Sequence, residues 1–300
     1  MSLFDNFKRA FYTLKDNLIL IVPLLITILI GFILIFSFLH FSGISKLMAD
    51  YSSLQKYVKT KQVTEEQLLD YFKVDFMKLV TLSNVITFIF LIIFLFTFPY
   101  YFRILSLVLM LFILKKQKLV LRNALELTNK LYFRYVLYTI LMFLIIFVPI
   151  SLIFVGLILI FLINVYFGIL SLIPFMIIVF AYQIFIIPKI IFSEPILFIE
   201  DKTAFDSVKQ SYLITKHHYF DALKVSAVVI AMYVIIQFLP KFVPKNLTYL
   251  INLQNPVNML TNWLLLVVFC SIIAFIATYD NLFLFYSYID FKAQNTQKEQ

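Results

Sequence analysis

The sequence predicts an all-α polytopic membrane protein with six transmembrane helices. Hydrophobic residues make up 63% of the 300-residue chain, charged residues only 14%, and the mean hydropathy is +0.98. Residues 135–188 hold no Asp, Glu, Lys, Arg or His over 54 positions, whereas one span needs only about 20 apolar residues. We therefore expect two spans here, folded back at residues 164–168, where Asn164 and Gly168 interrupt the apolar run.

The first surface helix and the first two spans are expected near the start of the chain. Residues 2–17 place large apolar side chains at helical spacing opposite charged ones, which is typical of an amphipathic helix lying on the membrane. Spans are expected at residues 18–41 and 79–102. Between them, residues 42–78 form a polar insertion that we interpret as amphipathic helices on the outer leaflet, with a partner-binding segment as the alternative.

The chain after the hairpin repeats this order. A surface helix begins at Thr203, the third in the chain after those at residues 2–17 and 119–131. Spans are expected at residues 225–239 and 259–279, joined by an outer loop. Each even-numbered span is followed by a short apolar connector, at residues 104–114, 190–199 and 281–289. These connectors are too short to cross a bilayer, and their apolar composition makes exposure to water unfavourable.

Matching residues indicate three repeats of a surface helix plus a two-span hairpin. The first and third surface helices match at a constant offset of 201, where Ser2, Phe4, Asp5, Lys8, Phe11 and Lys15 correspond to Thr203, Phe205, Asp206, Lys209, Tyr212 and Lys216. Residues 119–131, the second surface helix, match the third at an offset of 87 around Thr128 and Thr215. We expect a single membrane domain over residues 1–300, divided into repeats at 2–114, 115–199 and 200–290, with a disordered cytoplasmic tail at 291–300.

The distribution of basic residues orients this arrangement. The net charge is +9, and the side that carries the surface helices and connectors holds 17 of the 25 Lys and Arg residues. The positive-inside rule makes that side cytoplasmic, so both termini are expected inside a cell membrane, which we take to be a bacterial inner membrane. Because the basic residues flank apolar spans, we expect anionic membrane lipids as partners and no nucleic acid; a protein partner stays open.

Three charges occupy equivalent places at the inner ends of the second, fourth and sixth spans, namely Arg103, Lys189 and Asp280. If the repeats pack around a common axis, these side chains meet and leave one net positive charge, suited to a lipid phosphate. The alternative is that Arg103 and Lys189 extend separately to the inner headgroups. The surface helices supply further candidate headgroup contacts: Lys8, Arg9, Lys15, Arg122, Lys130, Lys209 and Lys216.

Few residues in the chain are suited to catalysis or cofactor binding. It holds three His, one Cys and four Gly, too few for a metal site of the usual ligands or a glycine-rich phosphate loop. The lone Cys270 lies in an apolar run and is expected in the core. We therefore expect no cofactor, no metal and no enzymatic activity.

Residues 186–223 carry a resemblance to a known family. A span ends at Pro188, an acidic residue follows at Glu194, and the next surface helix contains Ala204, Ser211, Thr215 and Lys216. This arrangement resembles the six-span membrane domain of bacterial glycerophosphodiester phosphodiesterases and related stand-alone inner-membrane proteins. The resemblance implies the six-span fold, but the short polar tail after Ile289 leaves no room for a phosphodiesterase domain, so no activity is carried over.

The function expected from these features is a non-catalytic membrane protein that organises lipid or a partner complex at the cytoplasmic face. The alternative is a transporter or flippase-like protein. Substrate pathways are usually marked by charged residues within the membrane, and none is expected deep in these spans, so such a substrate would have to be uncharged or lipid-like. A membrane-embedded enzyme is the least favoured class.

Overall fold

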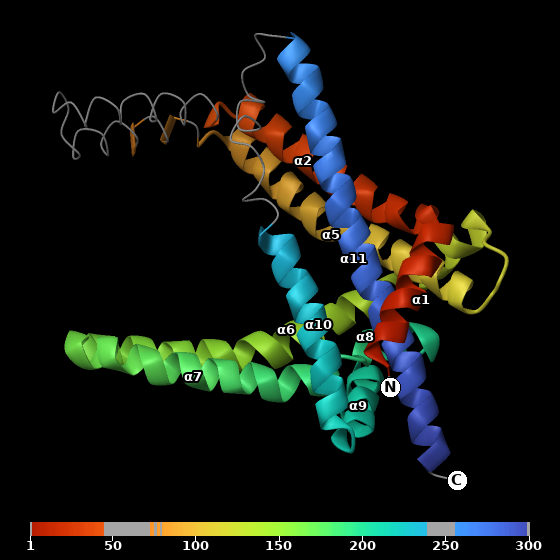
Figure 1. Cartoon of the computed structure of the whole chain (residues 1–300). Helices are drawn as coiled ribbons and strands as arrows, with labels where there is room; N and C mark the ends of the chain where they lie inside the picture. Colours follow the sequence, from red (N-terminus) through yellow and green to blue (C-terminus); the bar gives the residue numbers. More distant parts are fainter. Residues whose placement is uncertain (1, 45–72, 75–76, 79, 239–255, 299–300) are drawn as a thin grey trace. The chain divides into compact units, whose positions relative to one another are not determined.

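The computed structural model describes residues 2–44, 73–74, 77–78, 80–238 and 256–298 (Figure 1). Within these ranges the regular structure is helical and contains no strand. Six helices are long and apolar enough to cross a membrane, which confirms the predicted class. Most of the expected outer insertion at 42–78, and most of the loop at 240–258, lie outside the described residues.

The chain divides into two compact units. The first unit comprises residues 1–22, 103–240 and 275–300, and the second comprises residues 23–102 and 241–274. In the second unit, helix α2 (Val22–Phe41) packs against the first part of α11 (Pro256–Lys298). Cys270 of α11 is fully buried there beside Leu266, as expected for a core cysteine.

The first unit contains the helices before α2 and those between α5 (Leu82–Leu114) and α11. They are α1 (Leu3–Asp16), the 3₁₀ turn η1 (Leu18–Ile21), α6 (Leu121–Ile163), α7 (Val165–Ile190), α8 (Ser193–Ile199), α9 (Ala204–Lys216) and α10 (Tyr219–Phe238). Helices α6 and α7 lie side by side as a hairpin (Figure 1). Asn164 ends α6, and its side-chain oxygen accepts the backbone N–H of Tyr166 at 2.8 Å to begin α7. The predicted turn therefore forms by side-chain capping.

Gly168 permits the close approach of the two helices beside this turn. A methyl group placed on Gly168 overlaps the ring of Phe161, whereas one placed on Gly156, in the same hairpin, meets nothing within 4 Å. Gly168→Ala is therefore expected to destabilise the protein by about 1–3 kcal/mol through overpacking. Gly156→Ala should be neutral or slightly stabilising, because alanine is the better helix former. Thermal unfolding of both variants in detergent measures this difference, and equal midpoints would contradict it.

The three short apolar connectors form the core of the first unit. Their buried residues include Ile104–Leu111 of α5 (Leu82–Leu114), Phe192–Phe198 around α8, and Leu282–Phe285 of α11. Protein covers these side chains, which explains how segments too short to span the membrane can be so apolar. Only the middle connector has a helix of its own. The first and third connectors continue the helix of the preceding span. Neither contains a Gly or Pro that would end the helix: α5 has none after Pro99, and α11 has none after its first residue.

The two ends of the described chain lie against each other in this unit. Asn6 donates to Ser287 at 3.4 Å, the hydroxyls of Thr13 and Tyr286 are 2.7 Å apart, and Arg9 pairs with Asp290 at 2.9 Å. Residues 291–298, expected as the start of a disordered tail, continue α11 as helix, and Phe291 is buried.

Candidate functional site

An ion pair joins α5 to the connector helix α8. Nη2 of Arg103 lies 3.0 Å from Oε1 and 3.3 Å from Oε2 of Glu194. The Glu194 side chain is 9% exposed and that of Arg103 is 45% exposed. The hydroxyl of Tyr135, on α6, donates to the same Glu194 Oε1 at 2.7 Å. A carboxylate this deeply buried needs such donors, because its desolvation is otherwise costly.

The local structure around Glu194 explains its position. Glu194 lies in the first turn of α8, where the helix dipole favours a negative charge, and Pro195 is tolerated there because N–H groups in the first turn have no partner within the helix. Tyr138 lies one turn after Tyr135 on α6, and its hydroxyl is 2.9 Å from that of Ser193. Two tyrosines at helical spacing thus hold two successive residues of α8.

Asp280 of α11 lies near this pair. Its carboxylate interacts electrostatically with Glu194 and Arg103, and its Oδ1 is buried without a hydrogen-bond partner among the described residues. We call Arg103, Tyr135, Glu194 and Asp280 the junction cluster. It contains one guanidinium that is paired with the Glu194 carboxylate, and its members come from α5, α6, α8 and α11.

Lys189, the third member of the expected charge cluster, lies against aromatic rings. Its ammonium lies over the ring of Phe185, 3.3 Å from the centroid, and 5.0 Å from the ring centroid of Tyr212 on α9, and no ion pair with Asp280 is recorded between these two described residues. Near Arg103, Glu194 supplies a negative charge where Lys189 was expected to supply a positive one. Arg103 therefore does not carry the net positive charge that was expected to suit a lipid phosphate.

Sequence reasoning did not connect Glu194 and Tyr135 to this cluster. The available signal was a single acid within the apolar connector, since a buried acid requires a cation and further donors. Tyr135 and Tyr138 mark one face of a helix that enters the membrane, so their hydroxyls were candidate donors. Which cation Glu194 meets depends on tertiary packing and cannot be read from spacing.

A second polar cluster surrounds Glu200, directly after α8. Its carboxylate accepts hydrogen bonds from Lys292 Nζ at 2.6 Å, from Gln210 Nε2 at 2.7 Å and from the hydroxyl of Tyr288. Burial by itself raises the pKa of this carboxyl, but the bonds from Lys292, Tyr288 and Gln210 outweigh it and hold the pKa below its ordinary value. The cluster links the end of α8 to α9 and α11.

The lowered pKa of Glu200 predicts a pH-dependent contribution to stability. The folded-state pKa lies below the unfolded value of about 4.3, so the contribution is fully present above that pH and is lost as the pH falls through the folded-state pKa. Glu200→Gln should therefore show a smaller loss of unfolding midpoint between pH 6 and 3 than the unchanged protein. Identical pH profiles would contradict this linkage.

Helices α1 and α9 have two distinct faces. The inward faces bury Asn6, Ala10 and Leu14 on α1, and Ser207, Ser211 and Thr215 on α9. The hydroxyls of Ser211 and Thr215 donate to the free carbonyl oxygen of Lys189 at 2.9 and 3.3 Å. Phe4, Lys8, Phe11 and Lys15 of α1, and Phe205, Lys209, Tyr212 and Lys216 of α9, are exposed on the other faces.

The candidate headgroup contacts divide into two groups. Arg9 pairs with Asp290 at 2.9 Å and Arg122 pairs with Glu126 at 3.2 Å. The lysines of this set are all exposed, and none has a recorded ion pair with a described residue: Lys8, Lys15, Lys130, Lys209 and Lys216. These lysines are the more available ones for an external anion.

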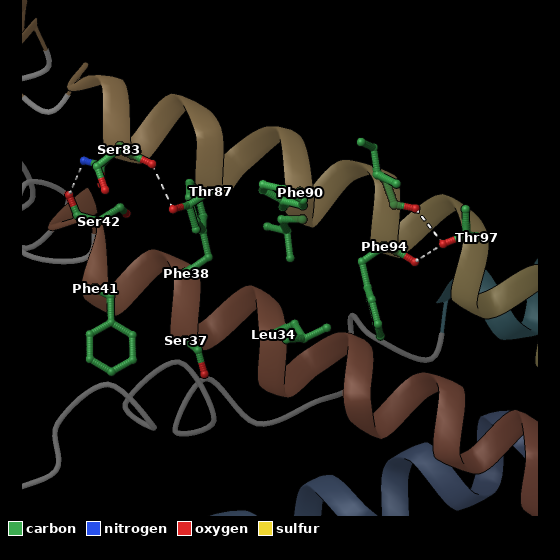
Figure 2. A pocket seen from close by; sticks show the side chains of 13 residues that line it. Leu34, Ser37, Phe38, Phe41, Ser42, Ser83, Thr87, Phe90, Phe94 and Thr97 are labelled. Atoms are coloured by element: carbon green, nitrogen blue, oxygen red, sulfur yellow. Dashed lines mark hydrogen bonds between the residues drawn. The ribbon is translucent and has the colours of Figure 1, made fainter.

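A groove lies between α2 and α5 in the second unit (Figure 2). It encloses about 600 Å³, and its thirteen lining residues include no charged side chain. Thr87 and Thr97 donate to carbonyl oxygens of their own helix at 2.8 and 2.9 Å, as the dashed lines in Figure 2 show. The groove is therefore uncharged, and two of the hydroxyls that line it on α5 are satisfied within their own helix.

Comparisons with known proteins give the chain no relative. No protein-family model, curated protein or solved structure matches it. Among the residues that the structure describes, no three His, Cys, Asp or Glu side chains are grouped so that they could hold a metal ion.

Proposed function

We propose that the chain is a non-catalytic integral membrane protein that organises lipid or a partner complex at the cytoplasmic face of a bacterial inner membrane. The observation that carries this proposal is that each of the two-faced helices, α1 and α9, comes directly before a helix long and apolar enough to cross a membrane. Asn17, the C-cap of α1, leads directly into η1 and α2, and α9 ends two residues before α10. Both helices therefore lie where spans enter the bilayer, with basic side chains outward. The excess of Lys and Arg on that side makes it the cytoplasmic one.

The proposal includes three repeats and two cytoplasmic termini. The burial pattern supports equivalence of α1 and α9, because Asn6, Ala10 and Leu14 lie 201 residues before Ser207, Ser211 and Thr215, and all six are buried. The caps also correspond. Ser2 accepts the N–H of Asp5 at 3.3 Å, and Thr203 accepts that of Asp206 at 3.2 Å.

Extraction of the full chain from native membranes into lipid nanodiscs tests the proposed function. Lipids and proteins that co-purify are identified together and compared with those around an unrelated six-span protein from the same membranes. We expect either enrichment of anionic lipid or a protein recovered in a fixed ratio. Bulk lipid composition with no recurring protein would contradict an organising role.

A transporter or flippase-like function is the second candidate, and the α2–α5 groove favours it. Its uncharged lining suits an uncharged or lipid-like substrate. Filling the groove with Ser83→Leu and Thr87→Leu should slow the exchange of a fluorescent neutral lipid between leaflets of reconstituted vesicles. If the protein causes no exchange above that of empty vesicles, this candidate is excluded for the lipid used.

A further inference from the structure

One exposed stripe with the same composition occurs on both α1 and α9. On α1 it consists of Phe4, Lys8, Phe11 and Lys15, at successive spacings of four, three and four residues, so all four side chains lie along one side of the helix. Phe4 and Phe11 are 65% and 48% exposed, and the ammonium of Lys8 lies 4.4 Å from the ring centroid of Phe4. We call this the α1 stripe.

The α9 stripe repeats this order at the same spacings. It consists of Phe205, Lys209, Tyr212 and Lys216, each 201 residues after its counterpart. Phe205 and Tyr212 are 66% and 44% exposed, and both lysines are exposed. In water, exposing two large aromatic side chains along a helix is unfavourable, so the composition indicates a surface that lies against something apolar.

The start of α6 provides an internal comparison. At the offset of 87, the positions of the α9 stripe correspond to Lys118, Arg122, Leu125 and Asn129. These keep basic residues but no aromatic ring, and Arg122 is engaged by Glu126. The alternation of aromatic and lysine side chains is therefore a property of α1 and α9, and a general abundance of basic residues does not account for it.

We propose that the α1 and α9 stripes are a duplicated binding surface for the headgroups of anionic phospholipids. This rests on the proposed function, which places both helices at the cytoplasmic leaflet. Aromatic rings favour the boundary between headgroups and acyl chains, and lysine ammonium groups at the same depth reach the phosphates. Because each helix adjoins the start of a span, its stripe can lie in the plane of this boundary while the opposite face stays packed on the protein.

The charge of the surface selects the lipid. A lysine near an anionic membrane contributes about fivefold in affinity, so the two lysines of one stripe together contribute about 25-fold. A zwitterionic headgroup gives no such gain. The expected partner is therefore an anionic glycerophospholipid, and two separate stripes on one protein give two points of attachment.

The test uses the full chain in mixed detergent–lipid micelles, titrated with phosphatidylglycerol or with phosphatidylcholine. Lys8→Gln/Lys15→Gln and Lys209→Gln/Lys216→Gln remove the lysines of one stripe each. Lys115→Gln/Lys202→Gln is the matched control, because both lysines are exposed, lie outside the stripes and remove the same charge. Native mass spectrometry measures bound lipid, and hydrogen exchange measures protection of α1 and α9.

Each stripe variant is expected to lose about 25-fold in preference for phosphatidylglycerol over phosphatidylcholine, with lost protection confined to its own helix, while the control keeps its preference. An equal loss in the control would overturn the proposal, because charge alone would then explain the binding. Inorganic phosphate that restores protection without lipid would also overturn it, since a free anion would suffice. Failure here together with a recovered protein partner in nanodiscs would leave the proposed organising function in place.

Discussion

Glu194→Gln is expected to lower the free energy of unfolding by about 2–4 kcal/mol. The change removes the buried charge that Arg103 and Tyr135 contact and leaves the guanidinium without the carboxylate with which it pairs. Breaking a fully buried pair costs about 3–5 kcal/mol, and we expect somewhat less because the Arg103 side chain is 45% exposed. Chemical or thermal unfolding of the purified protein in detergent measures the effect.

Glu126→Gln is the matched control for this prediction. It makes the same chemical change in the pair with Arg122, whose side chains are 86% and 65% exposed, and such surface pairs contribute about 0–1 kcal/mol. The double variant Arg103→Gln/Glu194→Gln should recover part of the loss, because no uncompensated guanidinium remains. Similar destabilisation by Glu194→Gln and Glu126→Gln would show that the junction cluster is not a structural element.

The second large effect is expected for Phe283→Ala. Phe283 is fully buried in the connector part of α11, and its ring centroid lies 4.6 Å from that of Phe7 on α1. Removing a buried phenylalanine side chain costs about 3–5 kcal/mol, and here it also removes a contact that holds α1. We expect a lower unfolding midpoint together with faster hydrogen exchange in α1.

Phe133→Ala provides the comparison for this substitution, since Phe133 is 80% exposed. If the connectors are a protein core, only the Phe283 variant should be strongly destabilised. If Phe283 instead faced lipid as part of a shallow membrane segment, the two substitutions would have similar effects. That result would contradict a protein core formed by the connectors and packed against α1.

Much of the helical framework could be predicted from the sequence. The charge-free stretch at residues 135–188 needed two spans, and Asn164 does end one helix and cap the next. Ser2 caps α1 by accepting the backbone N–H of Asp5, a bond between residues only three positions apart. These features follow from local composition and backbone hydrogen bonding, so neighbouring sequence is sufficient to find them.

The connectors and the ion pairs could not be predicted in the same way. An apolar segment covered by protein and one covered by lipid have the same composition, so residues 104–114 gave no indication that they form a core. The partner of Arg103 depends on contacts between residues 91 positions apart. Asp280 was expected to meet Arg103 and Lys189, but nothing in the sequence indicated that Arg103 would pair with Glu194.

The sidedness of the membrane protein is the claim on which the proposed function depends most directly. Single cysteines placed at Ser52 and Asn295 of a Cys270→Ser variant can be treated in intact cells with a thiol reagent that does not cross the membrane. With the inner ends of the spans and both termini in the cytoplasm, the cysteine at 52 should be labelled, and that at 295 should be labelled only after the cells are opened. Labelling at 295 with protection at 52 would contradict a cytoplasmic role for α1, α9 and the junction cluster.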